Sequence, residues 1–385
     1  MIICEPIVSG DEHVSFNAGL IWVAAVASSA PVTVWADPDH FARVRALLPA
    51  EIAERVVFET HLPPPRRLPY QARAWRDAVV AWQVVRRAAG TGARHVILSC
   101  AFPGTLIGAK LAVASLAKRR RPTVHTVVHG ALEDVWGWRS RHPFRRAVDM
   151  TGALRWPAPE GLKVVVLEAG IANDLVRALP RVASQLLVLE FPIVEAIPSP
   201  GLRRPGPVRV GFLGRANREK GFDRFCELAR AVTARGADVE FHAVGQVEPG
   251  AFTEQELQPL TNRPQEGPLG RATYLEQLLD LDLVAMLHDP EHYAHTASGV
   301  LLDAVAAERP VLSLPNPIIA ALVARHGSIG PRVEDLGAAT NFLVALDVSA
   351  LERPDFLAWR ENVRRVAQSR RPAEVAVSYA QALGR

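Results

Sequence analysis

The chain has 385 residues, enough for two domains with separate cores, and its 49% hydrophobic and 22% charged composition excludes a disordered protein. Its formal net charge of +4 hides an asymmetry: residues 1–190 carry 23 Lys and Arg against 16 Asp and Glu (+7), whereas residues 191–385 carry 21 against 24 (−3). Three cysteines, Cys4, Cys100 and Cys226, are too few and too scattered for a disulfide framework or a zinc site, which indicates a reducing compartment.

Short apolar runs alternate with helical stretches through the first half. Strands are predicted at residues 2–3, 32–35, 95–98, 124–128 and 164–167, and helices at 20–27, 79–85 and 170–179. This alternation predicts an α/β fold with a doubly wound parallel sheet. Met1 leads directly into an apolar pair with no basic region, and the apolar run 18–27 is too short to span a bilayer. We therefore expect a cytoplasmic protein.

The alternation stops at a proline-rich stretch, residues 191–207, and then resumes. This pattern predicts a first domain over 1–190, a linker over 191–207 and a second domain over 208–365. Strands in the second domain are predicted at 208–213, 239–244, 283–287 and 310–314. Two amphipathic helices, about 356–366 and 373–383, close the chain.

The second half contains two strand-loop-helix units whose loops carry complementary groups for one binding site. In the first, a buried strand breaks at Gly214, Arg215 and Lys220 follow, and a helix opens near Gly221. In the second, a loop ends in Ser298-Gly299 and leads into a helix with Asp303 in its first turn. Cations and helix N-termini at the carboxyl ends of parallel strands predict a phosphorylated ligand.

This spacing resembles the nucleotide-sugar domain of GT-B glycosyltransferases, in particular the retaining family four, well over residues 207–315 and loosely in the first half. The resemblance implies two Rossmann-like domains that face each other across a cleft, with the acceptor held by the first domain. It also implies that segment 366–385 crosses back to that domain. The ligand is then a nucleoside diphosphate-sugar, with UDP or GDP, which is a substrate and not a cofactor.

The resemblance assigns the diphosphate to the Gly-Arg loop and Lys220, with Gly245, Ser298 and Gly299 in the same binding set. Because Arg215 and Lys220 supply fixed cations, we expect no metal at the phosphates. In the family, two glutamates seven residues apart hold the sugar and the ribose. Here His295 and Asp303 stand at those positions. Ser298 could instead simply cap the helix, and Asp303 could be a first-turn acid that interacts favourably with the helix dipole. Both the binding and the structural interpretation of these residues stay open.

Three further candidates for catalysis lie in the first half. Glu12 and His13 follow the first strand in a loop that matches the family's glycine-rich loop in part. His129 follows a buried strand, where a histidine can take or give a proton near neutral pH. A loop histidine of this kind can equally be structural. With His295, these residues form the predicted catalytic set.

Two metal-like patterns are discounted. His288, His292 and His295 share one loop, but their irregular spacing across a proline does not fit a metal site. Asp280 and Asp282 resemble an Asp-x-Asp motif, but they lie between a helix and a buried strand, so we expect them to face solvent. No nucleic-acid motif accompanies the basic residues.

We therefore predict a retaining, metal-independent hexosyltransferase of polysaccharide, glycolipid or glycoconjugate synthesis. A nucleotide-sugar epimerase of the same fold and a non-catalytic partner protein are alternatives. Basic residues of the first half alternate with tryptophans: Arg66, Arg67, Trp75, Arg76, Trp82, Arg86, Lys118 to Arg121, Trp136 and Trp138 to Arg146. This pattern fits peripheral contact with an anionic membrane and a lipid-linked or glycan acceptor, or equally a solvated basic surface.

Overall fold

The computed structural model describes the whole chain except residues 11, 29, 64–67, 131, 138–140, 196, 198–204, 289–294 and 385. The chain forms two compact units: unit 1 is Met1–Glu195 together with Ser369–Arg385, and unit 2 is Ala196–Gln368. Much of the predicted linker 191–207 lies outside the described residues. In the described ranges, every helix is too short or too polar to cross a lipid bilayer.

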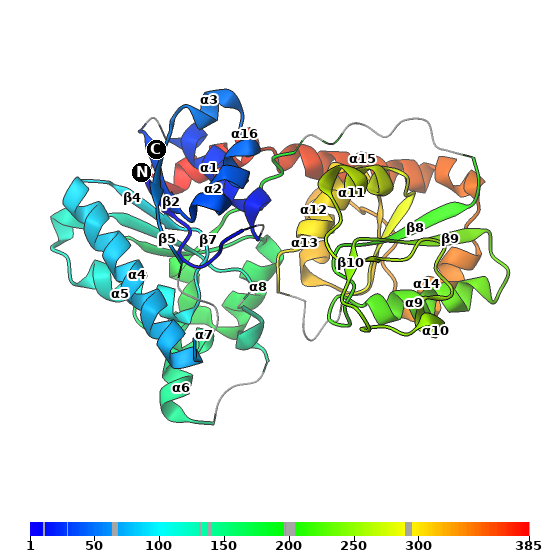
Figure 1. Cartoon of the computed structure of the whole chain (residues 1–385), viewed down its shortest axis with the longest axis horizontal. Helices are drawn as coiled ribbons and strands as arrows, with labels where there is room; N and C mark the ends of the chain where they lie inside the picture. The colour runs from blue at the N-terminus through cyan, green and yellow to red at the C-terminus, as the bar shows by residue number, and fades with distance from the viewer. Residues whose placement is uncertain are drawn as a thin grey trace. The chain divides into compact units, whose positions relative to one another are not determined.

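Unit 1 is built on a seven-stranded sheet in the order β3-β2-β1-β4-β5-β6-β7, and all its neighbouring strands are parallel (Figure 1). The strands are β1 (Ile2–Cys4), β2 (Val32–Ala36), β3 (Val56–Thr60), β4 (His95–Leu98), β5 (Thr123–Val127), β6 (Leu162–Val166) and β7 (Leu186–Val188). The sequence analysis missed β3 and β7. Both are edge strands and only partly buried, so their apolar pattern is weak.

Helices cover both faces of this sheet. They are α1 (Val14–Ala27), α2 (Pro38–Ala46), α3 (Ala50–Ala53), α4 (Tyr70–Thr91), α5 (Pro103–Ala114), α6 (Pro143–Val148), α7 (Met150–Arg155), α8 (Ala169–Ala178) and α16 (Pro372–Ala382), with the 3₁₀ turns η1 (Lys118–Arg120), η2 (Leu132–Val135) and η3 (Pro180–Gln185). Helices α1 and α5 are apolar around most of their circumference and are buried, as that composition requires.

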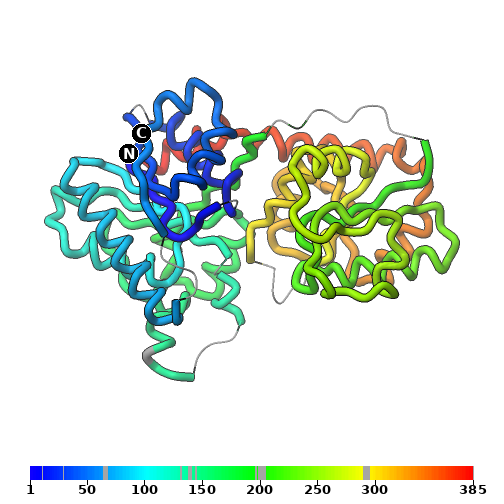
Figure 2. The backbone as a smooth tube through the Cα atoms, in the orientation of Figure 1, coloured from blue at the N-terminus to red at the C-terminus, as the bar shows by residue number. Residues whose placement is uncertain are grey.

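The last helix of the chain belongs to unit 1. Figure 2 shows α16, in red, beside α1, in blue. The hydroxyl of Tyr379 lies 2.5 Å from Nδ1 of the buried His125 on β5. Burial lowers the pKa of His125 to about 4, with smaller contributions from the charges of His95 and Lys163, so the ring is neutral at pH 7.

Arg370 ties the returning segment of the chain both to α8, through a buried ion pair, and to the outgoing segment, through a backbone hydrogen bond. Arg370, just before α16, donates to both carboxylate oxygens of Glu168 at 2.9 and 2.7 Å. Its side chain is 1% exposed. The backbone carbonyl of Arg370 also accepts a hydrogen bond from the N–H of Ile193 at 2.8 Å. Arg370 therefore fixes the outgoing and returning segments to the same point of unit 1.

Unit 2 has a four-stranded parallel sheet in the order β13-β12-β8-β9. Its strands are β8 (Val208–Leu213), β9 (Val239–Val244), β12 (Leu283–Met286) and β13 (Val311–Ser313), which confirms the four predicted strands. Its other elements are α9 (Phe222–Thr233), β10 (Gln246–Val247), α10 (Glu254–Leu257), β11 (Gln265–Glu266), α11 (Arg271–Leu279), α12 (Gly299–Ala306), α13 (Pro317–His326), α14 (Leu336–Val344), η4 (Val348–Glu352) and α15 (Pro354–Ser369).

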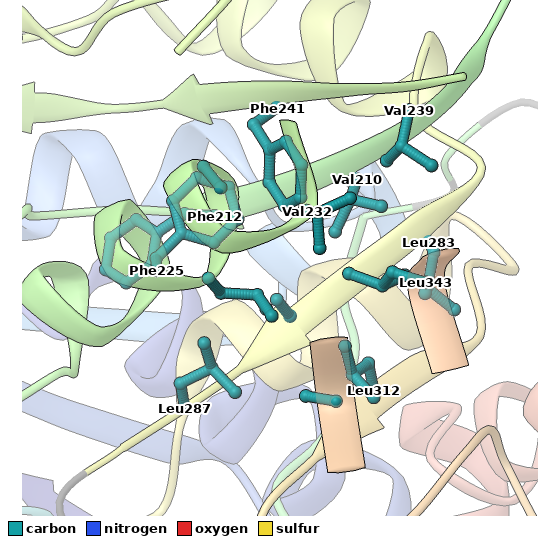
Figure 3. Close-up of a cluster of buried hydrophobic side chains, with 14 of the residues drawn as sticks. Val210, Phe212, Phe225, Val232, Val239, Phe241, Leu283, Leu287, Leu312 and Leu343 are labelled. Atoms are coloured by element: carbon teal, nitrogen blue, oxygen red, sulfur yellow. The ribbon is translucent and has the colours of Figure 1, made fainter. Parts of the chain in front are cut away.

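Aromatic rings form much of the unit 2 core. Phe212 of β8 and Phe225 of α9 lie with ring centroids 5.7 Å apart, and Phe225 meets Phe241 of β9 edge-on at 5.6 Å (Figure 3). Leu283 and Leu312 extend the same cluster across the sheet. This packing locks the sheet to α9 and so fixes the strand ends where the predicted phosphate loop lies.

One sequence-based expectation in this unit is wrong. Asp282 does not face solvent: it is buried, and its carboxylate accepts the backbone N–H of Arg209 at 2.9 Å. The neighbouring Asp280 forms an ion pair with the Arg209 guanidinium at 3.0 Å. Both acids thus bind Arg209 of β8. The buried carboxylate of Asp282 needs such a fixed donor, because burial without one is costly.

Arg370→Ala should lower the free energy of unfolding of unit 1 by about 3–5 kcal/mol, because it leaves the buried Glu168 carboxylate without its cation. Guanidinium denaturation followed by tryptophan fluorescence measures this loss. The neighbouring Arg371 is exposed, so Arg371→Ala is the matched control and should change stability by no more than about 0.5 kcal/mol. Equal midpoints for the two variants would contradict the assignment.

Candidate functional site

The carboxyl ends of β8 and β9 approach each other closely in unit 2. The N–H of Gly214, directly after β8, donates to the carbonyl of Val244 at 2.8 Å. A Cβ on Gly245 would lie 1.9 Å from the carbonyl oxygen of Gly214, so only glycine fits there. The structure therefore brings these two predicted binding glycines into direct contact.

The side chain of Lys220 lies close to Gly214, at the end of β8. Its Nζ lies 3.8 Å from the position that a Cβ on Gly214 would take. Burial lowers the pKa of the Lys220 ammonium, and the charge of Arg215 lowers it further. The side chain of Asn217 holds this turn by accepting the backbone N–H of Lys220 at 2.9 Å. Lys220 thus places a partly desolvated cation at the end of β8, where an anion would meet it.

Gly221 fixes the start of α9. It has a left-handed backbone, with φ of 73°, and caps the helix at its N-terminus. A Cβ at this position would lie 1.8 Å from the carbonyl oxygen of Leu287, which follows β12. The close approach sets the N-terminus of α9 against the end of the neighbouring strand.

His288 lies near Lys220 on the chain that leaves β12. Burial lowers the pKa of His288 to about 3, and the charge of Lys220 contributes to the same shift. The imidazole is therefore neutral at pH 7 and adds no charge beside the ammonium. Arg215, the other predicted cation, is exposed and forms an ion pair with Glu248. Glu248 therefore competes with a phosphate for this guanidinium.

Helix α12 points its N-terminus at the same strand end. Ser298 is its N-cap, and the hydroxyl accepts the N–H of Leu301 at 3.4 Å. Val300 of the first turn lies against Gly214, with its Cγ1 2.8 Å from the Cβ position there. His295, just upstream, is buried. His292 lies outside the described residues.

Asp303 does not lie in the first turn of α12, as the sequence suggested: it is the fifth residue, because the helix already begins at Gly299. Its carboxylate accepts two bonds from Arg271 of α11, at 2.8 and 3.3 Å, and one from the Tyr274 hydroxyl at 2.9 Å. Burial and the Asp303 charge raise the pKa of Tyr274, so the hydroxyl stays a donor. Sequence analysis missed Arg271 and Tyr274. Their spacing of three places both side chains on one face of α11, but nothing in the sequence indicates that this face meets Asp303.

A buried carboxylate organises the candidate residues of unit 1. Glu5, which directly follows β1, accepts hydrogen bonds from the N–H groups of Ile7 and Val8 at 3.1 and 3.0 Å. It also accepts from the Asn17 amide at 2.9 Å and the Ser99 hydroxyl at 2.7 Å. Sequence analysis missed this network. It fixes the loop that carries Glu12 and His13 to the loop that follows β4.

His13 and His129 are brought together, with ring centroids 4.1 Å apart. His13 caps α1 with a left-handed backbone, φ 59°, which is uncommon outside glycine. Burial lowers the pKa of His129 to about 3, the charge of His13 lowers it too, and a hydrogen bond with the backbone of Ser99 opposes the shift. His129 is thus neutral at pH 7 and suits hydrogen bonding or ligation better than proton transfer. Glu12 is exposed.

The sequence matches no known family model and no curated protein. Solved structures are similar over the full length. HepE from Anabaena, in complex with UDP and glucose, has a TM-score of 0.63 and 16% identity and covers 100% of this chain and 99% of its own. A glycosyltransferase from Rickettsia africae has a TM-score of 0.65 and 11% identity, covering 99% and 96%. WaaG, a glycosyltransferase involved in lipopolysaccharide biosynthesis, has a TM-score of 0.60 and 18% identity, covering 99% and 98%. These likenesses confirm the predicted GT-B fold.

Gly221→Ala should destabilise unit 2 by about 1–3 kcal/mol more than Gly250→Ala, the range for overpacking a filled site. Gly250 is a matched control because its φ of 74° is within a degree of that of Gly221, 73°, yet a Cβ there would have no atom within 4 Å. The difference between the two variants in urea denaturation isolates the contact with Leu287. If both variants lose the same stability, backbone strain alone explains the glycine.

Proposed function

We propose that this chain, whose fold is that of the GT-B glycosyltransferases, transfers a hexose from a nucleoside diphosphate-sugar to an acceptor. The observation that carries the proposal is the Lys220 ammonium, held over Gly214 at the end of β8 beside the N-termini of α9 and α12. A phosphate at this point meets a cation and backbone N–H groups together. HepE, of the same fold, has been solved with UDP-glucose.

Charge stabilisation is the main contribution of this site to the reaction. Negative charge grows on the β-phosphate as the bond to the sugar breaks, and donors fixed in advance stabilise it without reorganising. Lys220 supplies one such group, and Arg215 supplies a second once it leaves Glu248. The N–H of Leu301, now capped by Ser298, is available to the ligand by a small rotation of that hydroxyl. No metal ion is required at the phosphates in this scheme.

Retention of configuration is the stereochemistry we propose. In that scheme the leaving diphosphate itself assists the attacking hydroxyl, and no strong protein base is needed. The neutral state of His129 supports this choice, because a group with a pKa of about 3 is a poor general base at pH 7. His295 and Asp303, at the positions of the family's two glutamates, are assigned to the sugar and the ribose.

Two alternatives use the same fold without glycosyl transfer. An epimerase would convert the donor without an acceptor, so product analysis in the absence of acceptor distinguishes it. A non-catalytic partner is favoured by one observation: Arg271 and Tyr274 already occupy three acceptor positions of Asp303. In such a non-catalytic protein, Arg271 would keep the Asp303 carboxylate from the nucleotide unless its side chain moved aside.

Lys220→Ala should weaken binding of UDP or GDP by about 1–3 kcal/mol, the range for a charge-assisted hydrogen bond. Isothermal calorimetry measures it, and Arg215→Ala should give a loss in the same range. Arg218 is the control: it lies in the same loop but is held by Glu256 and Asp223, so Arg218→Ala should leave affinity nearly unchanged. Wild-type affinity in both Lys220→Ala and Arg215→Ala would remove the site assignment.

The acceptor is proposed to be lipid-linked and reached from an anionic membrane surface at the inner face of the cytoplasmic membrane. Helix α4 supports this with one stripe of residues at helical spacing: Trp75, Trp82 and Arg86. Trp75 is 72% exposed, and the Arg86 guanidinium lies 5.9 Å from the Trp82 ring centroid. The basic turn η1 is also exposed. Exposed indoles beside arginines suit a lipid headgroup layer. The predicted contacts Arg66, Arg67 and Arg139 lie outside the described residues.

The double variant Trp75→Ala, Trp82→Ala should lose most of its co-sedimentation with phosphatidylglycerol vesicles at low salt, and the wild type should be released at high salt. Attraction to an anionic leaflet is worth about 1 kcal/mol per basic residue near the surface and is screened by ions. Leu357→Ala, which removes an exposed apolar residue of α15, is the control. A wild-type protein that stays in the supernatant at low salt would favour a soluble acceptor.

A further inference from the structure

Three metal-ligating side chains converge at the carboxyl ends of β1, β4 and β5 in unit 1. His13 precedes α1, Cys100 follows β4, and His129 follows β5. One ligand atom from each residue lies within 4.8 Å of the other two. The three residues come from loops far apart in the sequence, which is why the cysteine count gave no zinc prediction.

The donor set is that of a zinc site. Imidazole nitrogen and thiolate sulfur bind Zn²⁺ at about 2.0–2.3 Å, which separates ligand atoms of a tetrahedral site by roughly 3–4 Å. Small side-chain rotations bring the three atoms from 4.8 Å into that range. Three protein ligands with an open fourth position are also the usual arrangement of catalytic zinc.

His129 is prepared for ligation in two ways. It is 9% exposed, and its Nε2 has no hydrogen-bond partner in the described part of the chain. Its ring is also oriented by a hydrogen bond with the backbone of Ser99. Histidines that bind metals commonly use their second nitrogen in this way, which fixes the ring. Ser99 is itself held by Glu5, so the support continues into the core.

Cys100 is a protonated thiol in the absence of metal. Burial raises the pKa of this thiol, the charges of Glu5, Asp77 and Glu12 raise it further, and the charge of Arg73 lowers it. A divalent ion must therefore displace the thiol proton, and it then supplies the positive partner that a buried thiolate needs.

We propose that His13, Cys100 and His129 bind one Zn²⁺ ion and leave its fourth position to water or a hydroxyl oxygen. Binding breaks the S–H bond of Cys100, forms a sulfur–zinc bond and releases one proton to solvent, with no electron transfer. All three ligands belong to unit 1, and the proposal does not rest on the proposed glycosyl transfer.

The first test is the zinc content of the full chain, prepared without a polyhistidine tag and dialysed after exposure to zinc chloride. Elemental analysis should give about one zinc per chain for the wild type and almost none for Cys100→Ser. Cys226 is buried but outside the cluster, so Cys226→Ser is the matched control and should retain the metal. A metal-free wild type, or full retention in Cys100→Ser, would overturn the proposal.

A second test avoids changing a buried residue. His13 is only partly buried, and His13→Asn keeps a residue type that tolerates its left-handed backbone, so this variant should fold normally. A competition titration with a zinc chelator should show its affinity reduced by at least about 100-fold. Cobalt should give the wild type a thiolate-to-metal charge-transfer band that Cys100→Ser lacks, because Cys100 is the thiolate of the cluster. Equal zinc affinity in the wild type and the His13 variant, or cobalt binding to the wild type without that band, would refute the ligand assignment.

Discussion

The buried carboxylate of Glu5 is the constraint on which unit 1 depends. An ionised group that is 2% exposed is very costly unless donors surround it, and this one has four, from the turn after β1, from α1 and from the start of the β4–α5 connection. His40 of α2 joins through Asn17 and through the Gly10 carbonyl. Each donor would lose its partner if its loop moved. The network therefore holds in register the two loops that carry His13 and Cys100.

In both units, burial keeps a histidine at a strand end uncharged at neutral pH. His129 and His288 each have a pKa of about 3, so neither contributes positive charge at neutral pH. In unit 2 this leaves Lys220 and Arg215 as the cations at the end of β8. In unit 1 the carboxylates around Cys100 leave a negative environment instead. The same strand-end architecture thus offers an anion site in one unit and a cation site in the other.

The sequence predicted those features that depend on local pattern. Buried strands show as apolar runs, and Gly214 and Gly221 mark turns because few other residues tolerate that backbone. The edge strand β3 was missed because its exposed face weakens the pattern. Partners that meet only after folding were also missed: the acceptors of Arg271 and of the Ser99 hydroxyl are determined by packing, not by spacing. The position of Asp303 was misjudged although Ser298 marks the cap of α12, because the helix begins directly after that cap, at Gly299, and its first turn ends before Asp303.

The position of Arg370 has a consequence for the order of folding during synthesis. Unit 1 is discontinuous, because its α16 follows all of unit 2 along the chain. On a ribosome, residues 196–368 emerge and can form their own core before Arg370 and Tyr379 exist to reach Glu168 and His125. Until then α1 lacks a neighbour, and Glu168 lacks its counter-charge. The first unit to begin folding is therefore the last to finish, and a nascent chain must keep that half-built surface from aggregating until its final helix arrives.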